Sequence, residues 1–194
     1  MLRAVRPMEA LVQLSGRSLV LRPYRDGDEE GQLEAVRASV AELGRWMDWC
    51  HPGYALADSR KWVELCTEGW ASGTQYGFCL IDPETGDHWG DCTLSGLNRA
   101  HGFANLGYWI RTDRAGRGAA TAAAGLVARF GLEQLALNRI EIVVAVVNLA
   151  SQRVAEKLGA VREGVLRRRL VVRGEAQDAV MFSLIASDLS AKDV

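Results

Sequence analysis

This sequence has few of the residues that build metal centres or disulfide frameworks. Its 194 residues include three histidines and four cysteines. The histidines are scattered and form no ligand set, and the cysteines follow neither a zinc-binding spacing nor that of a small disulfide-rich domain. We therefore expect no metal, and buried or free thiols in a reducing compartment. The cysteines are Cys50, Cys66, Cys79 and Cys92.

Long apolar runs and a strong charge bias are also missing. No window approaches the ~18 consecutive apolar residues of a membrane-spanning helix. Residues 1–7 lack the apolar core of a signal peptide. The formal net charge of −1 argues against a general nucleic-acid-binding protein, because such proteins carry an excess of basic residues. These absences predict a cytoplasmic protein with no membrane partner.

The sequence does contain an alternating order of strand and helix patterns. With 48% hydrophobic residues and no repeat or linker, residues 1–194 are expected to form one domain, with its core at about 17–187. Strands are expected at 18–24, 75–81, 89–97, 103–111, 140–147, 161–172 and 175–184. Helices are expected from Asp26 or Asp28 to Leu43, from Asp58 to Ala71, after Gly118, and at 149–158.

The most informative feature is a glycine-rich turn between a strand and an alanine-rich helix. The apolar run that ends at Arg111 is followed by Ala115-Gly-Arg-Gly-Ala-Ala120. The N-terminus of a helix exposes N–H groups without intrahelical partners and carries roughly half a positive charge. Glycines permit positive φ and close approach of a ligand. This order predicts an anion site suited to a phosphate or pyrophosphate, although a simple tight turn would use the same residues.

A second run strengthens that interpretation. The predicted strand at 140–147 is followed by Asn148-x-x-Ser-x-x-Val-x-Glu-Lys-Leu-Gly159. Together with the glycine turn, this run resembles the GNAT superfamily of acyl-CoA-dependent N-acyltransferases and, within it, the RimJ/RimL-like branch. The resemblance covers nearly the whole chain. It implies a mixed α/β fold, with a mostly antiparallel sheet of about six to seven strands, a splayed parallel central pair at 103–111 and 140–147, and about four flanking helices.

The resemblance implies that acetyl-CoA is the co-substrate and enters the gap between the two central strands. Its thioester carbonyl would meet a backbone N–H at a bulge around Trp109–Ile110, an arrangement that stabilises an oxyanion. An amine would then attack the thioester directly. The residues assigned to the cofactor site are Trp109, Ile110, Arg111, Gly116, Arg117, Gly118, Ala119, Ala120, Asn148 and Ser151.

Asn148 and Ser151 each have two interpretations. By resemblance, the amide of Asn148 binds the pantetheine arm, and the hydroxyl of Ser151 is a catalytic group that protonates the leaving thiolate. Both residue types also commonly cap helices, and one residue can do both.

The resemblance leaves the general base unassigned. Many relatives carry a glutamate near the start of the central strand, where this chain has Asn105. Asparagine accepts no proton but can hold a water, so Asn105 is a catalytic candidate of that kind. An α-amine with a pKa near 7.7–8 loses its proton at low cost, which makes a strong base less necessary. Other nearby candidates, each also suited to a surface or capping role, are Glu42, Asp48, Asp91 and His101.

The acceptor side is indicated by an aromatic loop at 43–52. In RimJ/RimL-like proteins the corresponding loop lines the acceptor entrance, which implies that Trp46 and Trp49 bind the substrate. The alternative is that both tryptophans only cover the core. The expected acceptor is a primary amine of a peptide N-terminus or of a small molecule, and a homodimer is possible.

Ala115 departs from the family pattern, which has Gln or Arg there, although Arg114 and Arg117 supply positive charge nearby. Two alternatives therefore stay open. One is a transferase of the same fold that takes its acyl group from aminoacyl-tRNA, and the other is a non-catalytic CoA-binding module. Arginines that could face RNA phosphates in the first alternative are Arg162, Arg167, Arg168, Arg169 and Arg173.

Overall fold

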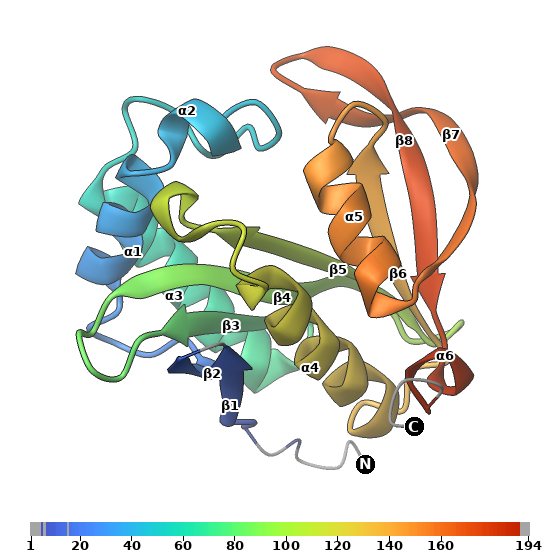
Figure 1. Ribbon diagram of the computed structural model, residues 1–194, viewed down its shortest axis with the longest axis horizontal. Coiled ribbons are helices and arrows are strands. Elements are labelled where there is room, and N and C mark those ends of the chain that lie inside the picture. The colour runs from blue at the N-terminus through green and yellow to red at the C-terminus, as the bar shows by residue number, and fades with distance from the viewer. Residues whose placement is uncertain (1–4, 6, 15, 191–194) are drawn as a thin grey trace.

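The computed structural model describes residues 5, 7–14 and 16–190 and contains one eight-stranded sheet with the order β1-β2-β3-β4-β5-β6-β8-β7 (Figure 1). Only β5 and β6 are parallel; every other neighbouring pair in this described sheet is antiparallel. The strands are β1 (Ala10–Leu14), β2 (Arg17–Pro23), β3 (Tyr76–Ile81), β4 (His88–Asn98), β5 (Phe103–Ile110), β6 (Arg139–Ala145), β7 (Val161–Val172) and β8 (Glu175–Leu184). The mixed, mostly antiparallel sheet with a parallel central pair is therefore confirmed.

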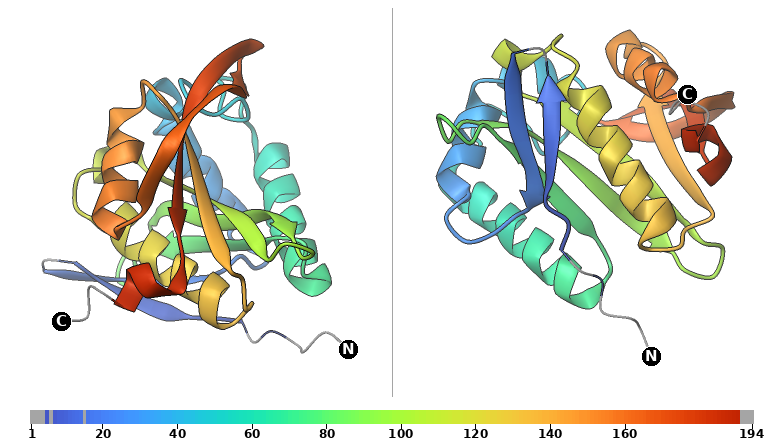
Figure 2. Two further views of the ribbon diagram at one scale, coloured as in Figure 1. Left: turned by 90° about the vertical axis from the view of Figure 1, so that its right-hand side faces the viewer. Right: turned by 60° about the horizontal axis from the view of Figure 1, so that its bottom comes forward.

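Helices cover both faces of the sheet. On one face α1 packs on β4 and α3 packs on β3, and on the other α4 crosses β4 and β5 while α5 lies against α4 and β6 (Figures 1 and 2). The helices are α1 (Glu29–Arg37), α2 (Val40–Leu43), α3 (Leu56–Ser72), α4 (Ala119–Glu133), α5 (Leu149–Leu158) and α6 (Ala186–Ser190), with a short 3-10 turn at Thr112–Arg114. None of the described helices is both long and apolar enough to span a membrane.

The element counts exceed the predicted ones for identifiable reasons. β1 was not predicted; it is a five-residue edge strand that pairs with β2 through a turn at Gly16. The single helix predicted to run to Leu43 is wrong, because the chain breaks between α1 and α2 at Ser39. The Ser39 hydroxyl donates to the Ala35 carbonyl at 2.7 Å, a local hydrogen bond that competes with continuation of a helix.

The predicted helix caps also need correction. Asp28 occupies the N-cap position of α1, but its carboxylate pairs with the Arg22 guanidinium at 2.7 and 2.8 Å instead of capping the helix. Asp58 is not the first residue of its helix. It lies one turn inside α3, where its carboxylate accepts the Ala55 N–H at 2.8 Å. Both carboxylates still stabilise the start of a helix, where the backbone dipole favours negative charge.

The parallel pair separates soon after it forms. The β5–β6 ladder joins Phe103 to Arg139 and ends where Asn105 faces Glu141. Beyond that point β6 stays paired with β8, so the sheet opens into two wings (Figure 2). This opening positions the site described next.

Candidate active site

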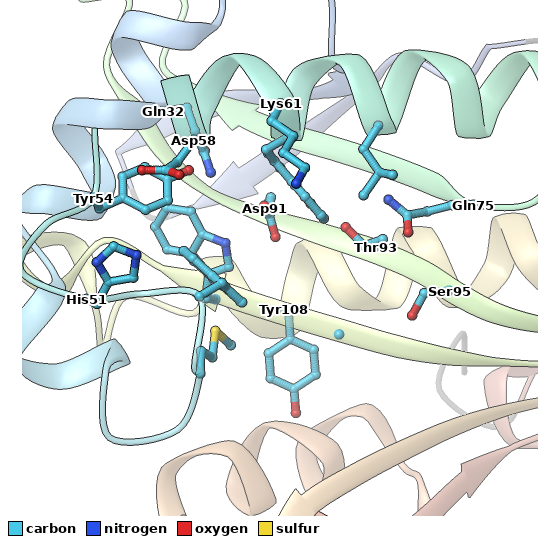
Figure 3. A pocket seen from close by; sticks show the side chains of 16 residues that line it. Gln32, His51, Tyr54, Asp58, Lys61, Gln75, Asp91, Thr93, Ser95 and Tyr108 are labelled. Atoms are coloured by element: carbon cyan, nitrogen blue, oxygen red, sulfur yellow. The ribbon is translucent and has the colours of Figure 1, made fainter. Parts of the chain in front are cut away.

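Two cavities lie on opposite faces of β5. The α4-side cavity, about 570 Å³, is bounded by the start of α4, the start of α5 and the α2 loop. The α3-side cavity, about 500 Å³, is bounded by α1, α3, β4 and β5 (Figure 3). Met47, Tyr108 and Trp109 line both of them. A group bound on one face of β5 is thus close to a group bound on the other.

The predicted glycine turn forms the floor of the α4-side cavity. Gly116 and Gly118 have φ values of 77° and 85°, a conformation that side chains disfavour. Gly118 is the N-cap of α4. The first turn of this helix has no acidic residue, and no side chain caps its N-terminus. The N–H groups at this end therefore face the cavity without a side-chain partner, as an anion site requires. The residues fit the pyrophosphate of a CoA ligand.

Arginines add positive charge to this floor. The guanidinium carbons of Arg114 and Arg117 lie 5.6 and 5.7 Å from the centre of the buried Trp89 ring, within cation–π range. Arg114 also pairs with Asp87 at 2.9 Å. Arg153 lines the same cavity from α5. These contacts hold cations beside the turn even though Ala115 replaces the usual polar residue.

The backbone of β5 offers hydrogen bonds to the opened gap. The Arg111 N–H donates to the Trp89 carbonyl at 2.8 Å, so alternation along the strand directs the N–H groups of Tyr108 and Ile110 away from β4. The expected bulge around Trp109–Ile110 is not found. In the described ladder the β4–β5 register is continuous from Ile110 to Asn105, and it shifts only beyond Ser95. The N–H groups become available because β6 departs, not because β5 is irregular.

Asn148 and Ser151 meet at the start of α5. The Asn148 side-chain oxygen accepts the Ser151 N–H at 3.1 Å, so Asn148 is the N-cap of α5. The Ser151 hydroxyl donates to the Tyr108 hydroxyl at 3.2 Å, and Tyr108 donates to the Ser151 carbonyl at 2.9 Å. Burial raises the pKa of Tyr108 to about 12. All three residues line the α4-side cavity, and Tyr108 was not among the predicted site residues.

The two tryptophans of the aromatic loop lie at different cavities. Trp49 lines the α3-side cavity, 41% exposed, with its ring centre 5.9 Å from that of Trp109. Trp46 lines the α4-side cavity instead. The two tryptophans predicted to bind the acceptor therefore do not line one common cavity, because the chain turns at Met47 between the two faces.

Two other predicted residues lie outside the cavity linings. The Arg111 side chain pairs with Glu34 and Asp113, each at 3.0 Å. Asn105 lies at the opening of the sheet, opposite Ser95 of β4. Neither residue is among those that line the α4-side or the α3-side cavity.

The remaining candidates for the base are widely separated. Glu42 lines the α4-side cavity, Asp48 accepts the backbone N–H of Arg173, and His101 is exposed in the turn between β4 and β5. Asp91 alone among the four lines the α3-side cavity. The arginines considered for RNA contact are exposed along β7 and its turn, and they line neither of these cavities.

Asp91 is 5% exposed and accepts a hydrogen bond from the Tyr24 hydroxyl at 3.2 Å. Burial raises its pKa from 3.8 to about 7, and the nearby indole N–H groups of Trp109 and Trp62 and the hydrogen bond from Tyr24 oppose that rise only in part. His88 is stacked between Tyr24 and Trp109, and burial lowers its pKa to about 4. In the described part of the chain no group of three or more His, Cys, Asp or Glu side chains is placed to hold a metal ion. The four cysteines are buried free thiols.

Comparison with known proteins identifies the class that this arrangement defines. The acetyltransferase (GNAT) domain family matches residues 18–161, and the chain belongs to it. The protein is an N-acetyltransferase that moves an acetyl group from acetyl-CoA to an amine, as the sequence predicted.

The relatives support the RimJ/RimL-like branch. The chain is 30% identical over 173 residues to YdaF of Bacillus subtilis, provisionally named a ribosomal N-acetyltransferase, covering 86% of this chain and 91% of YdaF. A Vibrio cholerae structure provisionally described as a ribosomal-protein-serine acetyltransferase is 27% identical, with a TM-score of 0.78 and coverage of 92% and 97%. Mycobacterium smegmatis RimJ in complex with CoA-disulfide shares the fold, with a TM-score of 0.84 at 24% identity and coverage of 93% and 88%.

Proposed function

We propose that the acceptor of this acetyltransferase is the α-amine of a peptide or protein N-terminus, bound in the α3-side cavity while acetyl-CoA occupies the α4-side cavity. The observation that carries this proposal is the pair of cavities that share Met47, Tyr108 and Trp109 across β5. An amine and a thioester that are bound on the two sides of these shared residues lose little further translational and rotational entropy when they react. The names of YdaF and the Vibrio cholerae relative point to protein acceptors.

The donor fits the α4-side cavity in a defined direction. The pyrophosphate would lie on the N–H groups at the start of α4, beside Gly116 and Gly118. The pantetheine arm would then follow β5 toward Tyr108, pairing with the N–H groups that β6 leaves unpaired. The Asn148 side-chain oxygen is already used by the Ser151 N–H, so its amide N–H₂ is the part that would donate to the arm.

With CoA bound in this direction, its sulfur would lie beside the hydroxyl groups of Ser151 and Tyr108. Ser151 donates a proton to the leaving thiolate in our proposal, and Tyr108 replenishes and orients it. A phenol with a pKa of about 12 stays protonated at neutral pH, so the pair keeps a proton ready for the leaving group. The C–S bond breaks as the amide bond forms.

An α-amine suits this site better than a lysine side chain. A lysine amine with a pKa near 10.4 costs about 4–5 kcal/mol to present neutral at pH 7, whereas an α-amine near 7.7–8 costs about 1 kcal/mol. Apolar and aromatic side chains line part of the α3-side cavity, among them Trp49 and Leu65. Such surroundings favour the amine that is more readily neutral.

The test uses two peptides of one sequence. The first has a free N-terminus and a lysine with its side chain blocked, and the second has a blocked N-terminus and a free lysine. With acetyl-CoA, mass spectrometry should find acetylation of the first peptide only. Acetylation of the lysine, acetylation of small amines alone, or transfer only from aminoacyl-tRNA would each overturn the proposal.

A further inference from the structure

We propose that Asp91 is the general base that accepts the proton of the attacking amine. This inference rests on the proposed placement of the acceptor in the α3-side cavity. Asp91 lies directly opposite Trp109 in the β4–β5 ladder, and Trp109 lines both cavities. Asp91 is therefore an acidic residue on the acceptor face that adjoins, in the sheet, a residue that both cavities share.

Strand alternation places Asp91 at the end of a polar row. Asp91, Thr93 and Ser95 all line the α3-side cavity from β4, and Figure 3 shows them side by side beneath α3, with Tyr108 pointing away on the opposite side of β5. The row follows β4 along the cavity, and Asp91 is its member opposite Trp109, which lines both cavities. Of its three members, only Asp91 can accept a proton at neutral pH.

The position of Asp91 is fixed by its neighbour Gly90. Gly90 has a φ of 146°, and a Cβ there would lie 2.1 Å from the Trp109 carbonyl oxygen. Only glycine allows β4 to approach β5 so closely at this point. The carboxylate that follows is thereby held beside the backbone of Trp109.

Asp91 is almost fully buried, and in the described part of the chain no ion pair with a cation compensates its charge. The charge of a carboxylate in such a place is poorly stabilised, so it takes up a proton readily while remaining partly ionised near neutrality. Lys61 lines the same cavity from α3, but it forms no ion pair with Asp91 in the described part of the chain. The polar and titratable groups that face Asp91 are Tyr24 next to β2, Tyr54 before α3, Trp62 and Cys66 of α3, Cys79 of β3 and Trp109 of β5.

Tyr24 is a positioning residue in this arrangement. Its hydroxyl lies 3.2 Å from Asp91, 2.9 Å from the Gln32 side-chain oxygen and 3.3 Å from His88. A phenol has one proton to donate, so it can turn toward Asp91 when the carboxylate is ionised and toward Gln32 when it is protonated. This exchange helps Asp91 to accept and release a proton without moving.

The proton balance of the step is complete without a further reactant. The amine nitrogen bonds to the thioester carbon, and the proton it loses passes to the Asp91 carboxylate. The carbon–sulfur bond breaks, and the thiolate takes a proton from the Ser151–Tyr108 pair. Asp91 then returns its proton to solvent through the open cavity, and water restores the hydroxyl pair.

The experiment measures kcat, both KM values and the pH dependence of kcat/KM, using the amine that the wild-type protein acetylates fastest. Asp91→Asn should lower kcat by at least about 100-fold and leave the KM for acetyl-CoA within about twofold. In its pH profile of kcat/KM, the variant should also lose the rise near pH 7, which Asp91 sets in the wild type. It should keep the rise that is set by the pKa of the amine. Asp91→Glu should restore the rise near pH 7. Asp82→Asn, which removes another buried carboxylate that lines neither cavity, should leave the profile unchanged.

Tyr24→Phe covers the case in which Asp91→Asn does not fold. Loss of a hydrogen bond that lowers the pKa of Asp91 should move the rise near pH 7 to higher pH. The assignment is overturned by a folded Asp91→Asn variant that keeps the wild-type kcat and pH profile, by one that raises only the acceptor KM, or by a Tyr24→Phe profile that does not move. Because the assay uses whichever amine the wild type prefers, these outcomes are separate from the peptide test of the proposed function.

Discussion

The hydroxyl of Ser151 lies 3.2 Å from the hydroxyl of Tyr108, across the gap between α5 and β5. If this pair protonates the thiolate, Ser151→Ala should lower kcat by about 100-fold or more, with little change in acetyl-CoA affinity. Tyr108→Phe should lower kcat as well, and the double variant should be little worse than the more damaging single one, because the two groups act as a unit.

The control for this prediction is Asn148→Ala, which should act mainly on CoA binding. Thiol release under saturating substrate and calorimetric titration with CoA measure the two effects. Small, equal losses of kcat in all three single variants would show that Ser151 serves only the helix.

Much of the fold followed from the sequence because its strongest signals are local. The glycine turn before α4 and the apolar strand before α5 were predicted from adjacent residues, and Asn148 was recognised as a possible cap. The break at Ser39 was missed because a serine inside an apolar pattern shows its effect only through its bond to Ala35. β1 was missed because it is short and lies at the edge of the sheet.

The candidate site was less predictable because it depends on which face each residue reaches. Trp46 and Trp49 are three positions apart, yet the loop turns between them and they line different cavities. Asp91 was one of several unassigned acidic candidates. Its burial and its contact with Tyr24 depend on pairing between strands that are distant in the sequence. Alternation along β4 was the signal that could have placed it on the same face as Thr93.

The turn before α4 predicts a second variant. Gly118→Asp should weaken acetyl-CoA binding at least about tenfold, or ~1.4 kcal/mol, because a carboxylate would repel the pyrophosphate at the N-terminus of the helix. Gly86→Asp is the matched control, since Gly86 has a similar φ of 78° and open space around it but lies outside both cavities. Calorimetry on folded proteins decides, and equal affinity in the two variants would refute the assignment of the anion site.

The aromatic loop predicts a division of labour between its tryptophans. Trp46→Ala should raise the KM for acetyl-CoA several-fold, because Trp46 lines the α4-side cavity. Trp49→Ala should raise the KM for the acceptor, because Trp49 packs near Trp109 on the other face. Steady-state kinetics with each substrate varied in turn measures both constants, and each variant is the control for the other. The opposite pattern would mean that the cavities are assigned the wrong way round.

His88 and Asp91 predict opposing effects of pH on stability. The pKa of His88 is lowered from 6.5 to about 4, so the unfolded chain binds the extra proton between these values and stability should rise with pH. The pKa of Asp91 is raised from 3.8 to about 7, so the folded protein holds the extra proton and stability should fall with pH. In the wild type these two slopes of stability against pH largely cancel between pH 4.5 and 6.5. Glu163, with a pKa lowered from 4.5 to about 2, changes the stability mainly below this window.

Replacing either titrating residue should therefore reveal the pH dependence that the other one causes. The unfolding free energy of Asp91→Asn, measured by urea denaturation, should rise by about 2 kcal/mol from pH 4.5 to 6.5, with a slope of at most ~1.4 kcal/mol per pH unit. His88→Asn should show a fall of similar size over the same window. The two variants are controls for each other because each keeps the titrating group that the other lacks. A flat profile for Asp91→Asn would mean that His88 is not held neutral by burial, and the same result for His88→Asn would mean that Asp91 is ionised in the folded protein throughout this range.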